Sequence, residues 1–382
     1  MMATDKKWIW EDVAYPHFQY DFKKLETRLA SVSRKQGELN TLGKIISKEH
    51  LQERQVLALE EEIISSSAIE NEILDRQSVK SSIKEKLGFE SVAHYTEKTK
   101  ESNFVDILID ANSNYREPLS LEKLFGWHRK MFDRDNRLWN IEVGGFRKKG
   151  TMQIVSGVIG KEKVFYEAPP HDRLEAEMNA YIRWFNSTPS SLLKASIAHL
   201  WFVIIHPFDD GNGRITRAIS DMVLSDIEKP STSRLYTISK SINTDRKGYY
   251  KALEKSTGYI AKAEPMDITI WCEWFLETVE KSLTEAISSI AYIVEKAKFW
   301  DRHRTTIFNE RQRRVLNMML EKDIKSSENQ LTTKKYKKMA NTTAPTASRD
   351  IKSLLDLGCI EQVLGSSGRN IRYEIVAMAK SL

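Results

Sequence analysis

The sequence predicts a mainly α-helical protein that carries two small β-hairpins. Apolar residues recur at helical spacing through most of the first third of the chain and again in its second half. Residues 192–205 are apolar on most sides of a helix, which is typical of a central, buried helix. Runs of β-branched and aromatic residues flank a glycine-containing turn at 152–168, and two further β-like runs are joined by glycines within 359–376. Each of these two patterns is typical of a hairpin.

The composition is that of a soluble globular protein. The chain has 382 residues, of which 41% are hydrophobic and 29% charged, enough for two or three domains with a sizeable core. Its first residues lack the apolar stretch of a signal peptide, and the longest apolar run, Leu200–Ile205, is too short to span a membrane. Cys272 and Cys359 lie far apart and suggest neither a disulfide framework nor a metal cluster. We therefore expect a cytoplasmic protein without a membrane partner.

The elements follow one another in three predicted domains. Residues 1–100 should form an N-terminal helical domain, in which LQERQVLALEEEIISSSAIENEIL is a long polar helix with an apolar stripe. Residues 101–300 should form the core, with helix continuing over 118–148 and the hairpin at 152–168 interrupting it. Residues 308–382 should form a separate C-terminal domain.

One twelve-residue stretch, HPFDDGNGRITR at 206–217, concentrates polar and flexible residues directly after the apolar helix. Pro207 disfavours helical backbone at the residue before it, so the helix should end at His206 with the ring free to face a cleft. A glycine-rich turn follows, and a new helix beginning near Arg214 would offer its first N–H groups to an anion. Arg214 and Arg217 are three residues apart, so they share one helix face and can grip phosphate oxygens.

Two further residues of this stretch complete a chemical site. Asp210 beside a phosphate site is suited to Mg²⁺, which usually takes one or two carboxylates together with substrate phosphates. His206, with an ordinary pKa of about 6.5, can take a proton from an attacking hydroxyl. The stretch therefore predicts a site that holds a nucleotide and transfers part of it to a hydroxyl. The alternative is an ordinary junction between two helices with a capping aspartate.

The stretch resembles the Fic family signature, HxFx(D/E)GNGRxxR, at every defined position. The resemblance implies a Fic-type helical core that transfers AMP from ATP to a serine, threonine or tyrosine hydroxyl of a protein and releases pyrophosphate. It implies that His206 is the general base, that Asp210 holds Mg²⁺ and that Phe208 packs the loop. The residues that would hold the phosphates are Gly211, Asn212, Gly213, Arg214 and Arg217.

A second acidic residue lies upstream, within the long polar helix. Helical spacing puts Glu70 on the same face as Ile63, Ser66 or Ser67, and Ile73 or Leu74, where it would be buried. A buried carboxylate needs a cationic partner, and Arg217 is the obvious candidate. The alternative is a glutamate at the helix edge that stays solvated.

The surroundings of Glu70 resemble a regulatory motif. Ser66-x-x-x-Glu70-Asn71 resembles the inhibitory (S/T)xxxE(G/N) motif that accompanies many Fic domains. The resemblance implies that Glu70 lies beside the nucleotide, pairs with Arg217 and keeps the γ-phosphate from its productive place. The enzyme would then be auto-inhibited until Glu70 is displaced. In some relatives the same glutamate instead supports removal of AMP from the target.

Other segments of the core resemble parts of Fic proteins less specifically. The hairpin at 152–168 takes the place of the family's flap, where an extended target segment could add as a strand; the alternative is a plain surface hairpin. Tyr249 and Tyr250 resemble the family's tyrosine near the adenine and ribose, and the alternative is a pair of core aromatics. Arg147 in GGFRKKG resembles a family arginine just before the flap, and the sequence suggests no role for it.

The C-terminal segment differs in charge and in element order. From residue 308 onward there are fourteen Lys and Arg against eight Asp and Glu, a net charge of +6 that equals the charge of the whole chain. The predicted order of three helices and two β-like runs matches a winged helix with TAPTASRDIKSLL as its recognition helix. The alternative is a protein-interaction or dimerisation module. The residues that could contact DNA phosphates are Lys334, Lys335, Lys337, Lys338, Arg349 and Lys352.

The combined prediction is a protein adenylyltransferase restrained by Glu70. It should use ATP and Mg²⁺, act on an unidentified target protein docked at the hairpin, and also modify itself; a homodimer and DNA binding stay open. One alternative is transfer of a phosphoryl, UMP or phosphocholine group, although the two glycines of GNGR argue against the kinase-like variant. The other is a transcriptional regulator that senses nucleotide without catalysis, which the intact motif disfavours.

Overall fold

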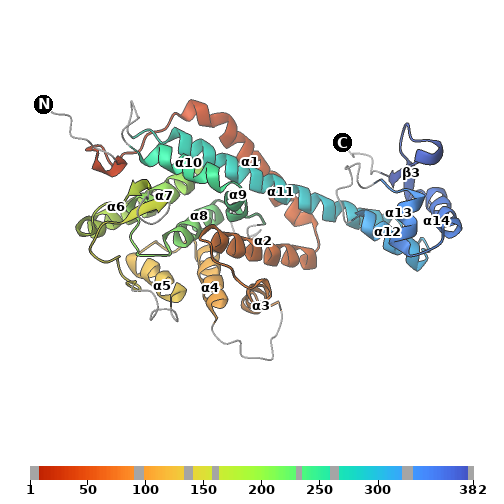
Figure 1. Ribbon diagram of the computed structural model, residues 1–382, viewed down its shortest axis with the longest axis horizontal. Helices are drawn as coiled ribbons and strands as arrows, with labels where there is room; N and C mark the ends of the chain where they lie inside the picture. Colours follow the sequence, from red (N-terminus) through yellow and green to blue (C-terminus); the bar gives the residue numbers. More distant parts are fainter. Residues whose placement is uncertain are drawn as a thin grey trace. The chain divides into compact units, whose positions relative to one another are not determined.

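Helices dominate the structure, as the sequence predicts (Figure 1). The computed structural model describes residues 8–89, 99–132, 141–156, 163–228, 235–258, 266–320 and 330–376. The chain divides into two compact units, Met1–Ile287 and Ser288–Leu382, and α11 (Thr269–Arg302) runs through the boundary between them. None of the helices within the described ranges combines the length and the apolar character that crossing a membrane requires.

The first unit contains ten helices before α11 in its described part. Many begin at a side chain that accepts a backbone N–H, as Asp21, Ser47 and Ser191 do, which satisfies donors that the helix itself cannot pair. The helices are α1 (Phe22–Ile45), α2 (Lys48–Ile69), α3 (Arg76–Lys86), α4 (Lys100–Ser113), α5 (Leu121–Met131), α6 (Leu174–Ser187), α7 (Leu192–Ile205), α8 (Asn212–Glu228), α9 (Ile238–Thr244) and α10 (Arg246–Thr257).

Helix α7 forms the centre of this unit, which confirms the prediction of a central helix over 192–205. Nearly all of its side chains are buried, because apolar residues surround the whole helix. It packs against α8 and α6, and α8 in turn contacts α2, α4 and α5. The junction between α7 and α8 therefore lies between two helices that both pack against several others.

Helix α2 buries polar side chains as well as apolar ones. Ser65, Ser66 and Ser67 are each at most 2% exposed, and Glu62 is 4% exposed. Glu62 accepts a hydrogen bond from the backbone N–H of Ser239 at 3.2 Å and another from its hydroxyl, which ties α2 to α9. Buried polar side chains need polar partners on neighbouring elements, and those of α2 bond to α8 as well as to α9.

The predicted hairpin is present as strands β1 (Gln153–Ser156) and β2 (Lys163–Glu167), paired antiparallel. Its turn, 157–162, lies outside the described residues. The outer edge of β2 is covered at one point, because the Trp10 indole donates to the carbonyl oxygen of Glu167 at 2.7 Å. The prediction of helix throughout 118–148 is wrong for 141–148, which form turns and coil around Gly144 at φ 72°.

The second unit has the predicted order of elements: α12 (Glu310–Leu320), α13 (Thr333–Ala340), α14 (Ala344–Asp356), then β3 (Ile360–Gln362) paired antiparallel with β4 (Tyr373–Ile375). Apolar side chains from all these elements form its core. Asp350 is buried in that core and accepts hydrogen bonds from Arg311 and from the Tyr336 hydroxyl. The name winged helix for this arrangement stays a prediction.

Candidate active site

The loop between α7 and α8 holds the predicted catalytic stretch in a defined conformation. Helix α7 ends at Ile205 as predicted, and His206 adopts left-handed backbone at φ 50° and ψ 59° where Pro207 forbids ordinary helix. Gly211 is also left-handed at φ 80°, and a side chain there would collide with Met131 and Phe132. Helix α8 begins at Asn212, two residues before the predicted start.

His206 is prepared to accept a proton. Its Nδ1 lies 3.3 Å from the carbonyl oxygen of Val203, and a carbonyl only accepts, so Nδ1 carries the proton and Nε2 keeps the lone pair. Burial lowers the pKa of His206 to about 4, although the hydrogen bond to Val203 opposes that shift. The ring is therefore neutral at pH 7, with Nε2 as its basic atom.

Arg147 fixes the backbone on which His206 is mounted. Its side chain is 2% exposed, and Nε donates to the carbonyl oxygen of His206 at 2.9 Å, while Nη2 donates to the carbonyl oxygen of Pro169 after β2. Its backbone N–H donates to the carbonyl oxygen of Pro207 at 2.8 Å. Arg147 thus joins the end of the hairpin to the base, a role that the sequence alone did not suggest.

Asn212 and Phe208 close the loop from within. The Asn212 side chain accepts from the backbone N–H of Phe208 at 3.0 Å and donates to its carbonyl oxygen at 2.7 Å. Phe208 is fully buried and stacks on the His128 ring at 4.3 Å between centroids, in the packing role predicted for it. Because the Asn212 side chain is used for loop closure, only its backbone N–H is available to a phosphate.

The start of α8 has the features of an anion site. The N–H groups of a first helical turn have no acceptor within the helix, and the helix dipole adds partial positive charge there. Arg214 and Arg217 follow on one face of the same helix, with side chains 6% and 2% exposed. Gly213 has no Cβ, and one placed there would collide with the carboxylate of Glu70. That carboxylate therefore lies directly on the backbone that an incoming phosphate would approach.

Asp210 is the acidic residue nearest this anion site in sequence. Its Oδ1 accepts from the Gly211 N–H at 2.5 Å and lies 3.4 Å from Nη2 of Arg214, and the side chain is 58% exposed. In the described part of the chain no three His, Cys, Asp or Glu side chains group as metal ligands would. A single exposed carboxylate beside an anion site suits Mg²⁺ that shares its coordination with phosphates.

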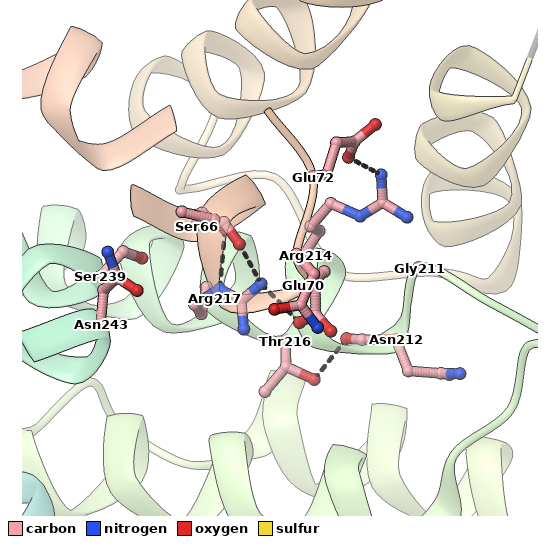
Figure 2. Close-up of polar contacts among 12 residues, drawn as sticks. Ser66, Glu70, Glu72, Gly211, Asn212, Arg214, Thr216, Arg217, Ser239 and Asn243 are labelled. Carbon is pink, nitrogen blue, oxygen red and sulfur yellow. Dashed lines mark hydrogen bonds and ion pairs between the residues drawn. The ribbon is translucent and has the colours of Figure 1, made fainter. Parts of the chain in front are cut away.

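Figure 2 shows Arg217 held by the end of α2. Its Nη2 lies 2.8 Å from Oε1 of Glu70, and the same nitrogen donates to the carbonyl oxygen of Ser66 at 2.9 Å. Nε of Arg217 donates to the Ser66 hydroxyl at 2.7 Å. The predicted trio of Ser66, Glu70 and Arg217 is thus brought together, although 147 residues separate Glu70 from Arg217 in the chain.

Glu70 reaches Arg217 from a different backbone position than helical spacing suggests. Helix α2 ends at Ile69, Glu70 follows it, and Asn71 is left-handed at φ 60°. Leu74 is only 8% exposed, as the predicted face requires, but the prediction is wrong for Ile73, which is 97% exposed. The side chain of Glu70 itself is 33% exposed. Arg246 holds the turn from outside, donating to the carbonyl oxygen of Ala68 and, at 3.2 Å, to the Asn71 side chain.

The two predicted adenine-side tyrosines have different surroundings. Tyr249 is buried, and its hydroxyl lies 3.2 Å from Nε2 of His199, as expected of a core aromatic. Tyr250 is 47% exposed, with its ring centroid 5.2 Å from that of Tyr249. Burial raises the pKa of Tyr250, and the nearby Glu70 carboxylate raises it further. Tyr250 is therefore the one of the pair that a ligand could reach.

Comparisons with known proteins agree with the resemblance of the stretch 206–217 to the Fic signature. Residues 118–224 match the model of the Fic/DOC family, and residues 8–89 match a domain of unknown function (DUF4172). The segment 118–224 includes His206, Arg214 and Arg217, and the segment 8–89 includes Ser66 and Glu70. Residues 118–224 are therefore similar to Fic/DOC family domains, which agrees with the resemblance at that level.

Individual relatives are distant. The protein adenylyltransferase Fic of Nematostella vectensis is 25% identical over 177 residues, which cover 45% of this chain and 35% of that protein. A Fic family protein from Desulfovibrio desulfuricans G20 is 18% identical with a TM-score of 0.48, covering 92% of this chain and 97% of that chain. A Fic domain containing signaling protein from Bacteroides thetaiotaomicron VPI-5482 is 18% identical with a TM-score of 0.49, covering 68% and 98%. The chain thus spans about a third of the length of the curated relative it matches.

Proposed function

We propose that the protein transfers AMP from ATP to a hydroxyl group of a target protein. The observation that supports this most directly is the meeting of a neutral base and an anion site at one helix junction. His206 ends α7 with a basic Nε2, and the first turn of α8 follows with two arginines for the phosphates. A base beside a phosphate site is what attack of a hydroxyl on a nucleotide requires.

In the proposed reaction the target hydroxyl oxygen attacks the α-phosphorus of ATP. Nε2 of His206 takes the hydroxyl proton as the new oxygen–phosphorus bond forms. The bond from the α-phosphorus to the bridging oxygen breaks, and pyrophosphate leaves with that electron pair. The N–H groups of Gly211 to Gly213 would hold the α- and β-phosphates, that of Gly211 after its bond to Asp210 breaks. Arg214 and Arg217 would hold the outer phosphates.

Asp210 would hold Mg²⁺, which neutralises phosphate charge when bound. Its carboxylate is 58% exposed and lies beside the proposed phosphate site, which fits this task. Arg147 acts on the same reaction through the backbone of His206, since it determines where the base lies.

We further propose that Glu70 restrains this reaction. A phosphate bound to Arg217 would have to displace a carboxylate that is already 2.8 Å from Nη2. The collision of a Cβ at Gly213 with Glu70 supports the same idea, because the carboxylate fills the approach to the α8 amides. Displacement of the turn after α2 would open both places at once.

The target segment would bind along the hairpin, and the contacts favour the edge of β1. A strand added to a sheet edge needs free backbone groups. The Trp10 indole already occupies the carbonyl oxygen of Glu167 at the outer edge of β2. An extended segment with serine, threonine or tyrosine would therefore pair with β1, and a segment of a second copy of the chain would serve for self-modification.

The test compares transfer of label from α-³²P-ATP and from γ-³²P-ATP in the wild type, Glu70→Gly and Glu70→Gly with His206→Ala. We expect label from the α-phosphate alone, increased by Glu70→Gly and abolished by His206→Ala. Label from the γ-phosphate alone would make the protein a kinase. No label in any variant would refute group transfer from ATP and favour a regulator that senses nucleotide.

A second candidate activity, DNA binding, is supported by one observation on the C-terminal unit. All six of its candidate cations on α13 and α14 are exposed, while the acidic residue of α14 nearest them, Asp350, is turned inward to Arg311. A gel-shift titration at physiological salt with duplex DNA should therefore show binding that weakens steeply as salt rises. Lys337→Glu should weaken it, Lys281→Glu in the first unit should not, and absence of any shift would refute the idea.

A further inference from the structure

Arg214, the first arginine of the catalytic stretch, is also engaged by a carboxylate. Its Nη1 lies 2.7 Å from Oε2 of Glu72, with side chains 6% and 16% exposed, and Figure 2 shows this pair next to the pair formed by Glu70. The guanidinium lies over the Phe132 ring at 5.4 Å. A charge so far removed from solvent interacts strongly with whatever anion faces it.

The backbone explains how two carboxylates reach two arginines. Asn71 between Glu70 and Glu72 is left-handed, and the Glu72 N–H returns to the carbonyl oxygen of Ser67 at 3.0 Å. The chain therefore folds back over the end of α2 and sends both acidic side chains toward α8. Arg214 and Arg217 are three residues apart there, so each meets a different carboxylate.

We infer that Glu72 is a second residue that controls nucleotide binding, and that it withholds Arg214 from the outer phosphates as Glu70 withholds Arg217. This inference rests on the proposed function, because it takes the two arginines as ligands of the phosphates. The turn 70–72 then acts as one clamp with two carboxylates. Removing Glu70 alone frees only one of the two arginines.

Lys100 is a second cationic partner of Glu72. It begins α4, is 45% exposed, and contacts the other carboxylate oxygen, Oε1, of Glu72. When a phosphate binds Arg214, Glu72 can stay paired with Lys100, so its carboxylate is not left buried without a positive charge beside it. Without Lys100, Glu72 should therefore hold Arg214 more firmly. Without the charge of Glu72, Arg214 should be free to bind a phosphate.

The experiment measures ATP affinity directly, by isothermal titration with Mg-ATP, and measures transfer separately. The variants are Glu70→Gly, Glu70→Gly with Glu72→Gln, and Glu70→Gly with Lys100→Gln. The matched control adds Glu61→Gln to Glu70→Gly, because Glu61 lies on the same helix but pairs with Arg76. Thermal melting verifies that each variant is folded.

We expect Glu72→Gln to tighten ATP binding about tenfold beyond Glu70→Gly, which corresponds to about 1.4 kcal/mol. Lys100→Gln should weaken binding several-fold, and Glu61→Gln should leave it unchanged. Equal or weaker binding with Glu72→Gln would overturn the inference and make Glu72 a residue that orients Arg214 for the phosphates. In that case Glu70→Gly still binds ATP and transfers AMP, so the proposed function stands. If Glu70→Gly itself binds no ATP, the proposed function fails and the inference fails with it.

Discussion

Replacing Glu70 by glycine is the perturbation for which the structure allows the clearest estimate. The Arg217 guanidinium is 2% exposed, and its Nη2 lies 2.8 Å from Glu70, whose side chain is 33% exposed. Charges about 4 Å apart attract by about 4 kcal/mol at an effective dielectric constant of about 20. Solvation of the displaced carboxylate offsets part of this, and a hydrogen bond to a charged group contributes about 1.5–3 kcal/mol net.

This free energy converts into a change in rate. Under the proposed function, ATP must break the pair before Arg217 can bind a phosphate. Glu70→Gly should therefore raise kcat/KM for ATP about 10- to 100-fold, at about 1.4 kcal/mol per factor of ten. Initial rates of AMP transfer from α-³²P-ATP, measured over a range of ATP concentrations, give that ratio. Glu61→Gln is the control, since it also removes a carboxylate from α2 but one that pairs with Arg76.

Two results would refute the reasoning. An unchanged kcat/KM in Glu70→Gly would mean that the pair with Arg217 does not compete with phosphate. An equal increase in Glu61→Gln would mean that loosening α2 in general, and not freeing Arg217, releases the activity.

Four further predictions follow from the surroundings of the base. Because burial lowers the pKa of His206 to about 4, the transfer rate should stay level from pH 7 down to about pH 5 and fall only below that, whereas a midpoint near 6.5 in a pH–rate profile would contradict a buried base. Phe208→Ala should lower the free energy of unfolding by about 3–5 kcal/mol in urea titrations, since the ring is fully buried, and a loss below about 1 kcal/mol would show that the loop does not depend on it. Arg147→Met should lower kcat about tenfold with little change in KM for ATP, because it frees the backbone of His206; an equal rise in KM would show a general loss of the site. His128 and His199 are fully buried, and burial lowers their pKa values to about 4 and about 3. On acidification the unfolded chain takes up their protons before the folded chain does, so the free energy of unfolding should fall from pH 6.5 to about 4 by about 1.4 kcal/mol per pH unit for each histidine. His199→Gln should reduce that slope in urea titrations at a series of pH values.

Local patterns in the sequence predicted the parts of the fold and the site that depend on local physics. The apolar character of 192–205 predicted the central helix, and Pro207 predicted its end at His206, since both effects act within a few residues. The predicted hairpin and the element order after residue 308 are also present. The packing role of Phe208 was implied by the resemblance to the Fic signature, and the ring is fully buried.

The predictions that failed, or were missed, depend on backbone turns and distant partners. Helical spacing carried α2 past Ile69, although Asn71 is a residue type that often adopts left-handed backbone after a helix, a signal that could have placed the end correctly. The contacts of Arg147 and Arg246 and the pair between Glu72 and Arg214 join segments far apart in the chain. Spacing along the sequence contains no information on such contacts.

The division of the clamp between two segments has a consequence for the history of the gene. Glu70 and Glu72 belong to the segment 8–89, and their arginines to the segment 118–224, which match two separate family models. A recombination that replaced the segment 8–89 would keep every residue of the α7–α8 loop and yet remove both carboxylates that pair with its arginines. If the proposed restraint holds, chains that carry the segment 118–224 alone need another source of control, and in chains that carry both segments the acidic turn and the two arginines should change together.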